Sequence, residues 1–278
     1  MTTPGSQTTP DTDLAGYARH LSGVATQAAQ LVAPDLRTAF RTAFDIDYKR
    51  DRHDPVTEHD QQAEEAIAEL LTTKVPGSAV VGEEGGARSG SGDVTWYVDP
   101  IDGTASFAHG LAFFCTSIGA VVDGEVVAGV VLDPIAGDLF TADLTGAWHN
   151  GDPLRSRGVA EEADALLITS YPNARALEPD PAGALARFGA LVTAYGTLRR
   201  PGSAALSLCH VAAGWADAAL GTSVNAWDVC AAQLVVRRAG GYYQAFGGEG
   251  WDQPGYFAHT HDLHAESLYG FAAEWAGR

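Results

Sequence analysis

The chain has 278 residues, 46% hydrophobic and 19% charged, which is the composition of a globular protein with a sizeable core. Its formal net charge is −18, so neither a polyphosphate backbone nor an anionic membrane is an expected partner. The three cysteines, Cys115, Cys209 and Cys230, form no CxxC pair, and no stretch is apolar enough for a signal peptide or a membrane span. We therefore expect a cytoplasmic protein.

The first half of the chain is predicted to start with a polar tail, residues 1–12, followed by helices. Apolar residues recur at helical spacing from about Leu14 to Phe44, with a break expected near Pro34. A further helix is expected over QQAEEAIAELL, where Thr57 and Asp60 resemble a capping box. The strand-like segments that follow are separated by turn residues and predict an antiparallel sheet: SAVVG, DVTWYVD, FFCTSIGAVVD, EVVAGVVLD and DLFTAD.

The second half alternates between strand and helix patterns, which favours an α/β layer. Strands are expected over ALLITSY, WADAALGT and YYQAF, and helices over ALARFGALVTAYG, RRPGSAALSLCHVAAG and NAWDVCAAQLVVRRAGG. A last helix is expected from about Asp262 to Trp275. A hairpin over GAWHNGDPLR marks the boundary between an N-terminal α+β half, residues 13–152, and a C-terminal α/β half, residues 153–278.

The stretch WYVDPIDGT, residues 96–104, ends a predicted strand with two aspartates three positions apart. Pro100 restricts Asp99 to an extended backbone, and Gly103 permits a tight turn beside Asp102. Two carboxylates at a strand end suit a shared hard cation, Mg²⁺ or Mn²⁺, and the following amides suit an anion at a helix start. Asp-Pro and Asp-Gly are also common turn dipeptides, so this stretch alone fits a solvated turn as well.

Three other acidic patches lie at the ends of predicted elements. Glu83 and Glu84 follow a strand in VVGEEGG, Asp54 opens DPVTEHD, and Asp228 lies in the first turn of a predicted helix. Each patch has a plain structural interpretation: a solvated loop, a helix cap, or a carboxylate that complements the helix dipole. Their shared position at element ends makes a common metal site the stronger interpretation.

Together these motifs resemble those of the inositol monophosphatase-like family of Mg²⁺-dependent phosphomonoesterases. The resemblance covers residues 14–275, and its most specific feature is DPIDGT followed downstream by WD-x-x-A-A. Its other carriers are DPVTEHD, GEE and RRPGSAALSL. It implies a layered α-β-α-β-α sandwich with α+β and α/β features, a homodimer, and hydrolysis of a small phosphorylated metabolite.

The resemblance implies two to three Mg²⁺ ions per site, with Mn²⁺ as an alternative. Glu83, Asp99 and the backbone carbonyl of Ile101 would bind one ion. Asp99, Asp102 and Asp228 would bind a second, with Asp99 bridging. Two cations so placed activate water and stabilise the charge of a phosphoryl group.

The resemblance also implies roles in catalysis. Thr104, together with Asp54, would orient the attacking water, and Glu83 would face a third ion through water. The amides of Gly103 and Thr104 would bind phosphate oxygens. Glu84 is expected to support the site. From its position shortly before Asp54, Lys49 could reach the site, but a solvated lysine is the expectation.

The substrate is less constrained than the reaction. Inositol and histidinol phosphatases of the family carry a Glu seven residues before the helix Asp, whereas this chain has Gly221 there. Ala204 matches a family position beside the substrate. Sugar or polyol phosphates, histidinol phosphate and nucleotide 3′-phosphates all remain open, and Ile101 in DPIDGT favours the first. A non-catalytic, regulatory member is the alternative from another class.

The three histidines of FAHTHDLHAESL invite a zinc interpretation. They lie at a predicted helix start, no cysteine accompanies them, and no further ligand is evident. Because a zinc site needs a convergent third and fourth ligand, we expect none here.

Overall fold

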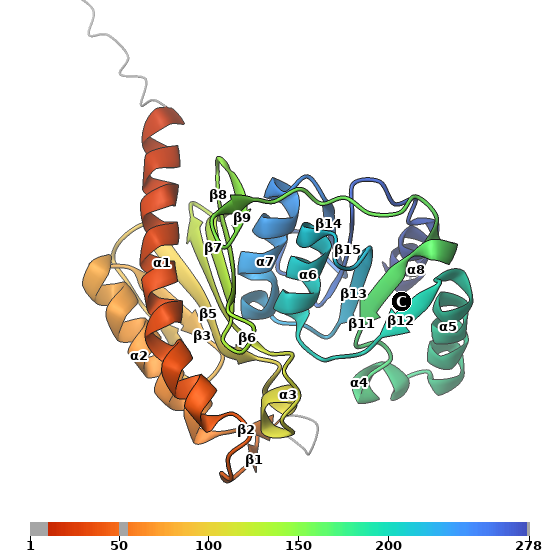
Figure 1. The fold of residues 1–278 in the computed structure, drawn as a ribbon, viewed down its shortest axis with the longest axis horizontal. Coiled ribbons are helices and arrows are strands. Elements are labelled where there is room, and N and C mark those ends of the chain that lie inside the picture. The colour runs from red at the N-terminus through yellow and green to blue at the C-terminus, as the bar shows by residue number, and fades with distance from the viewer. Residues whose placement is uncertain (1–10, 50–54, 277–278) are drawn as a thin grey trace, which may run out of the picture.

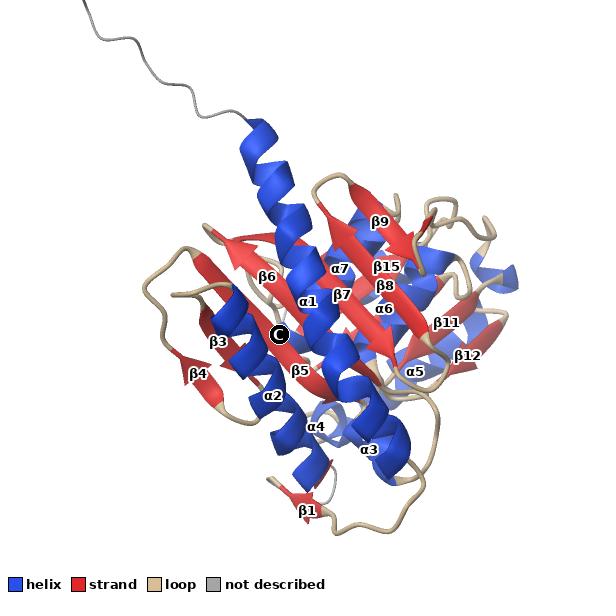
Figure 2. Ribbon diagram, turned by 60° about the vertical axis from the view of Figure 1, so that its left-hand side comes forward, coloured by secondary structure: helices blue, strands red, loops and turns tan. Residues whose placement is uncertain are grey.

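Two helices form the first layer of the computed structural model, which describes residues 11–49 and 55–276. Helices α1 (Asp11–Ala39) and α2 (Glu58–Lys74) lie side by side across one face of the larger sheet (Figure 2). The expected break in α1 is wrong, because the helix continues through Pro34. Leu21 and Leu36, on either side of Pro34, are both buried, so packing holds the helix together where a backbone hydrogen bond is missing.

The larger sheet has eight strands in the order β10-β9-β8-β7-β6-β5-β3-β4. β3 pairs with β5 in parallel, so the prediction of an antiparallel sheet is wrong for the pairing of SAVVG with DVTWYVD. All other neighbours are antiparallel, as predicted. Its strands are β3 (Ala79–Gly82), β4 (Gly86–Arg88), β5 (Val94–Asp102), β6 (Cys115–Val122), β7 (Glu125–Asp133), β8 (Asp138–Asp143), β9 (Gly146–His149) and β10 (Asp152–Pro153).

Two small elements lie near the end of β5. The short helix α3 (Thr104–Ala108) follows β5 after one residue. A two-stranded sheet, β1 (Asp47–Tyr48) with β2 (Pro55–Val56), joins α1 to α2.

Helices α6 (Ala204–Ala213) and α7 (Ala226–Arg238) form the middle layer, between the two sheets (Figure 1). α7 packs directly on the larger sheet through two glycines. A Cβ on Gly119 would lie 2.3 Å from Cys230 Sγ, and a Cβ on Gly129 would lie 2.5 Å from the carbonyl oxygen of Ala231. Glycine at these positions therefore lets α7 approach β6 and β7, next to the strand β5 that ends in Asp99 and Asp102.

The smaller sheet has five strands in the order β12-β11-β13-β15-β14, and β11 is parallel to both of its neighbours. Helices α4, α5 and α8 lie beyond this sheet (Figure 1), which completes the predicted α-β-α-β-α order. The bounds are β11 (Leu166–Thr169), β12 (Thr197–Arg199), β13 (Ala218–Thr222), β14 (Tyr242–Phe246), β15 (Gly255–His259), α4 (Ala174–Leu177), α5 (Pro181–Ala194) and α8 (Glu266–Ala276), with a 3₁₀ turn at Glu162–Asp164.

Several predicted elements have other bounds in the structure. The helix expected from Arg199 begins at Ala204, because Pro201 and Gly202 precede its N-cap, Ser203, whose hydroxyl accepts a hydrogen bond from the amide of Leu206. α8 begins at Glu266, not at Asp262. Strand β15 was missed, because its five residues are all buried and show no alternation.

The residues of the histidine-rich stretch do not converge on a metal site. His259 belongs to β15, where its ring bonds to the carbonyl of Thr260 and to the hydroxyl of Tyr269. The ring of His261 instead stacks on Tyr242. Across the described ranges, no helix is both long and apolar enough to cross a membrane.

Candidate metal centre and active site

Three aspartates from two elements bring carboxylate oxygens within 4.8 Å of one another: Asp99, Asp102 and Asp228. Asp99 and Asp102 lie at the end of β5, where the β5–β6 register shifts between them. Asp228 lies in the first turn of α7, which the close packing on β6 and β7 brings to this sheet end. The structure thus brings together carboxylates that are more than 120 positions apart in sequence.

Asp102 is held by donors from the start of α6. Its carboxylate accepts hydrogen bonds from the Ser203 hydroxyl at 2.6 Å, the Ala205 amide at 2.6 Å and the Ala204 amide at 3.3 Å. Ala204 therefore contributes its backbone amide to the site, which the sequence did not reveal. The amides at the start of α6 orient a carboxylate of the cluster and complement its charge.

Asp99 and Asp228 are also held by backbone amides. Asp99 accepts a hydrogen bond from the amide of Ile101 at 3.0 Å, which tightens the DPID turn. Asp228 accepts one from the amide of Asn225 at 2.7 Å, as part of a capping box at the start of α7. Each carboxylate keeps at least one further oxygen lone pair for another ligand.

Electrostatics disfavours ionisation of this cluster in the protein alone. Burial raises the pKa of Asp102 to about 6, although its hydrogen bonds act in the opposite direction. Burial, and then the charges of neighbouring carboxylates, raise the pKa of Asp99 and Asp228 well above the usual range. No basic side chain of the described residues pairs with any of the three. All-oxygen donors without a counter-charge fit a hard divalent cation.

Glu83 and Glu84 follow β3 and face Lys49. The Lys49 ammonium lies 2.9 Å from Glu83 Oε1 and also contacts Glu84 Oε1. Burial alone lowers the pKa of Lys49, but the charge of Glu83 and hydrogen bonds to both glutamates outweigh it and hold the pKa above its usual range. Lys49 is exposed, as expected of a solvated lysine, but its ammonium pairs with two glutamates, which the sequence did not predict.

Buried Glu64 of α2 shapes the loop that carries these two glutamates. Its carboxylate accepts hydrogen bonds from the amides of Glu84 at 2.8 Å and Gly85 at 2.6 Å. A Cβ on Gly82 would lie 2.4 Å from the same carboxylate, so the loop needs glycine there. Sequence reasoning missed Glu64. Its spacing could have revealed it: Glu64 lies four residues after Asp60 and three before Ile67, which places this carboxylate on the buried face of the helix.

Thr104 contacts Asp60, a residue that the sequence analysis treated as a helix cap. The Thr104 hydroxyl lies 3.1 Å from Asp60 Oδ1 and 3.0 Å from the carbonyl oxygen of Ile101. Asp60 also accepts bonds from the amide and hydroxyl of Thr57, which confirms the capping box. Asp54, the predicted partner of Thr104, lies outside the described residues.

Gly103 is the N-cap of α3 and has φ +96°, a conformation that favours glycine. A Cβ at this position would lie 2.9 Å from the carbonyl oxygen of Phe113. The turn therefore requires glycine on two counts. The amides of α3's first turn, beginning with Thr104, have no carbonyl partner within this short helix.

A small cavity of about 170 Å³ opens beside Asp102 and Asp228. Ala204 lines it, whereas Gly221 does not, although its neighbours Leu220 and Thr222 do. Most of the remaining lining is polar: Thr169, Ser170, Asn173, Ser203, Ser207, Ser223 and Tyr256.

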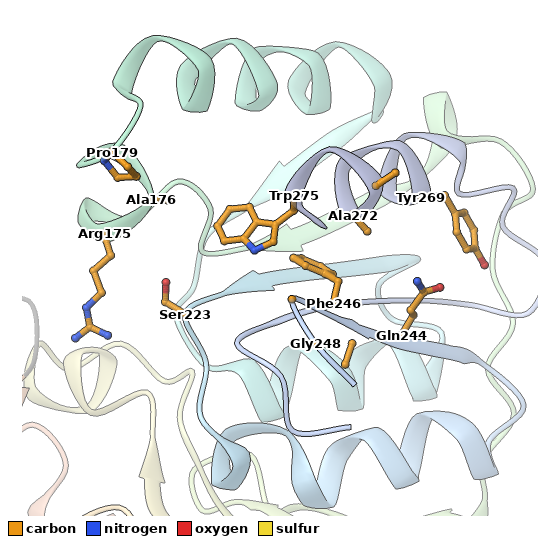
Figure 3. Close-up of a pocket in the computed structure, with 13 residues that line it drawn as sticks. Arg175, Ala176, Pro179, Ser223, Gln244, Phe246, Gly248, Tyr269, Ala272 and Trp275 are labelled. Atoms are coloured by element: carbon orange, nitrogen blue, oxygen red, sulfur yellow. The ribbon is translucent and has the colours of Figure 1, made fainter. Parts of the chain in front are cut away.

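A larger pocket of about 870 Å³ lies between α4, β14 and α8 (Figure 3). Trp275 and Phe246 form one wall, and Arg175 lies on the opposite side (Figure 3). Ser223 borders both the larger pocket and the small cavity. None of the predicted site residues lines the larger pocket.

A sequence model of the inositol monophosphatase family matches residues 18–275. The chain belongs to the inositol monophosphatase family. Family proteins are metal-dependent, and the carboxylate cluster provides a place for a metal in this member. The resemblance seen in the sequence motifs is confirmed.

The chain is similar to family members named SuhB and to members named inositol monophosphatase. It is 40% identical over 199 residues to the "Nus factor SuhB" of Pasteurella multocida, covering 70% of this chain and 73% of that protein. It is 35% identical over 234 residues to "Inositol monophosphatase 3" of Solanum lycopersicum, covering 82% and 86%.

Solved structures of the family have the same fold. The extragenic suppressor protein suhB of Bartonella henselae superposes with a TM-score of 0.80 at 29% identity, over 90% of this chain and 96% of that one. The inositol monophosphatase of Anabaena superposes with a TM-score of 0.78 at 27% identity, over 92% and 96%. The predicted layered fold is thereby confirmed.

Proposed function

We propose that the chain is a Mg²⁺-dependent phosphomonoesterase that hydrolyses a small phosphorylated polyol or sugar. The observation that carries the proposal is the convergence of Asp99, Asp102 and Asp228 beside a small polar cavity. Membership of a family that includes inositol monophosphatases supports it. Hydrolysis of phosphate monoesters is very slow without a catalyst, and positioning with charge stabilisation supplies most of what a protein contributes.

Asp99, Asp102 and Asp228 would hold Mg²⁺, together with Glu83 and the carbonyl of Ile101. When bound, divalent ions lower the pKa of water and stabilise negative charge on a phosphoryl group. Binding at Glu83 requires the Lys49 ammonium to share or leave that carboxylate. The hydrogen bonds from Ile101, Asn225 and the start of α6 keep the other carboxylates in place for this purpose.

Thr104 and Asp60 would orient the attacking water. The Thr104 hydroxyl donates to Asp60 or to the carbonyl of Ile101, which leaves its oxygen lone pairs available to a water molecule. Burial raises the pKa of Asp60, as suits a carboxylate that takes up a proton during the reaction. This assignment gives Asp60 the role that the sequence analysis gave to Asp54.

The amides of Gly103 and Thr104 would bind phosphate oxygens. They lie at the start of α3, directly after Asp102, so the phosphate would lie between backbone donors and the metal ligands. Ala204, on the cavity wall, would contact the alcohol half of the substrate.

We propose a homodimer in the cytoplasm that has no nucleic-acid or membrane partner. The net charge of −18 supports the absence of a polyanionic partner.

Phosphate release from a panel of monoesters tests the proposal. We expect release from polyol or sugar phosphates that depends on Mg²⁺ and stops with a chelator. The panel includes histidinol phosphate and adenosine 3′,5′-bisphosphate, which represent the other two substrate classes. Absence of release from every ester, with Mg²⁺ and with Mn²⁺, contradicts the proposed activity.

A regulatory role is the second candidate function. It is favoured by the similarity to proteins named "Nus factor SuhB", several of them 36–40% identical. The carboxylate cluster and the Thr104–Asp60 pair count against a role without catalysis, since binding alone does not need them. The phosphate-release assay separates the two candidates.

A further inference from the structure

Tyr256 of β15 lies directly opposite Gly221 of β13 and covers it. A Cβ on Gly221 would lie 2.3 Å from Cε1 and 2.9 Å from Cζ of Tyr256. No side chain fits at position 221 unless the ring moves. The absence of a Glu at this position is therefore coupled to the presence of the tyrosine across the strand pair.

The Tyr256 ring is held rigidly in this place. Its side chain is 2% exposed, and its ring stacks on Tyr243 with centroids 5.9 Å apart and planes at 16°. Tyr243 is itself fixed, because its hydroxyl donates to the carbonyl of Trp251 at 2.9 Å. The orientation of the Tyr256 ring is thus set before any ligand arrives.

The Tyr256 hydroxyl has no hydrogen-bond partner in the described part of the fold. Tyr256 lines the 170 Å³ cavity beside Asp102 and Asp228, and its hydroxyl makes no hydrogen bond to any residue in the described ranges. An aromatic ring across from a glycine stabilises a strand pair, but phenylalanine covers the glycine equally well. The hydroxyl is therefore free to bond to a molecule in the cavity.

The charges around the cavity limit which class of substrate can bind in it. Among its described lining residues only Asp102 and Asp228 are charged, and both belong to the metal cluster. The rest of the polar lining consists of hydroxyl and amide side chains. Once the cluster holds its cations, no carboxylate remains in the cavity to pair with a substrate ammonium group.

We propose that Tyr256 is a substrate-binding residue that sets specificity, its phenolic hydroxyl hydrogen-bonding to a hydroxyl on the alcohol half of the phosphomonoester. This inference rests on the proposed phosphatase function. It assigns the substrate to the esters of uncharged polyols. Esters that carry an ammonium group near the phosphate are disfavoured, because their charge has no partner in the cavity.

The substitution Tyr256→Phe tests the inference, with Tyr242→Phe on the neighbouring strand β14 as the matched control. The measured quantity is the kcat/KM for glycerol 2-phosphate divided by that for 4-nitrophenyl phosphate, whose alcohol half carries no further hydroxyl. We expect this ratio to fall about tenfold or more in Y256F, as for a lost hydrogen bond to a substrate hydroxyl. In Y242F, whose side chain is exposed and lies outside the cavity, the ratio should stay near that of the wild type.

An unchanged ratio in Y256F, or an equal fall in Y242F, overturns the inference. Thermal melting of both variants shows whether a fall comes from lost structure. If the wild-type protein hydrolyses neither ester, the proposed function is wrong. Calorimetric binding of glycerol 2-phosphate then decides the role of Tyr256: weaker binding by Y256F supports it, and equal binding overturns it.

Discussion

The hydroxyl of Thr104 lies 3.1 Å from the carboxylate of Asp60, which joins the first turn of α2 to the turn that carries Asp99 and Asp102. The contact spans 44 residues and links two motifs that each have a local structural role. Asp60 caps α2, and Thr104 begins α3. The same two side chains thus organise local backbone and face the candidate site.

Removal of this contact should slow turnover while the fold is preserved. We expect Thr104→Ala and Asp60→Asn each to lower kcat by about 10²–10⁴-fold, because a positioned proton acceptor typically contributes this much. Thr38→Ala is the matched control, since the Thr38 hydroxyl bonds only to a carbonyl within α1. Steady-state kinetics at saturating Mg²⁺ provides the measurement. Near wild-type turnover in T104A would remove Thr104 from the mechanism.

Replacement of one aspartate of the cluster should have opposite effects on activity and stability. Asp99→Asn keeps an acceptor for the Ile101 amide but removes one of three unfavourable buried charges. The metal-free variant should therefore melt at a higher temperature than wild type near pH 8, while turnover and the Mg²⁺-induced rise in Tm disappear. Asp138→Asn, on β8 and three strands away from β5, serves as the control. Retention of both metal effects in D99N would show that the ligand assignment is wrong.

The stability of the metal-free protein should fall as pH rises from about 4 to about 7. Burial raises the pKa of Asp102 to about 6 and that of Glu84 to about 7, above ordinary carboxyl values of about 4. The folded state therefore favours the protonated forms, and this stabilisation is fully present below the unfolded pKa and is lost as pH rises through the folded one.

Mg²⁺ should reverse this trend, because it binds the deprotonated carboxylates. Melting curves from about pH 5 to about pH 8, with chelator and with excess Mg²⁺, give the comparison. The Mg²⁺-induced rise in Tm should grow with pH. A rise that is independent of pH would mean that these carboxyl groups are already ionised without metal.

Loss of the Lys49 ammonium should strengthen Mg²⁺ binding. Lys49 neutralises part of the charge on Glu83, which we expect to be a metal ligand, and competes for its oxygen. We expect Lys49→Met to lower the Mg²⁺ concentration for the half-maximal Tm shift by about threefold to tenfold, since the pair is only partly exposed. Lys74→Met, in the last turn of α2, is the control. Weaker Mg²⁺ binding in K49M would instead show that Lys49 orients Glu83.

The sequence predicted what local patterns determine. Asp99 and Asp102 share one strand end, Asp228 lies in a helix start, and the alternation of strands and helices implies the layers. Combined with the resemblance to a family, these patterns were enough to predict the fold and to bring the three aspartates into one hypothesis.

Contacts between distant elements could not be predicted in this way. Glu64 and Asp60 lie at helical spacing on α2, but nothing local shows that one carboxylate meets the Gly85 amide and the other meets Thr104. Lys49 precedes a segment without periodicity. Tyr256 belongs to the missed strand β15, so its position over Gly221 depends on a register that the sequence did not reveal.

The coupling between Gly221 and Tyr256 predicts non-additive stability effects. Gly221→Ala places a Cβ within 2.3 Å of the Tyr256 ring and should destabilise the protein by about 1–3 kcal/mol, as overpacking typically does. Tyr256→Ala should cost about 3–5 kcal/mol, because it leaves a cavity and uncovers the glycine. In the double variant the new methyl group meets no ring, so the combined loss should be smaller than the sum by about 1 kcal/mol or more. Urea unfolding of the four proteins measures this double-mutant cycle. Strict additivity would mean that the two residues do not compete for the same space.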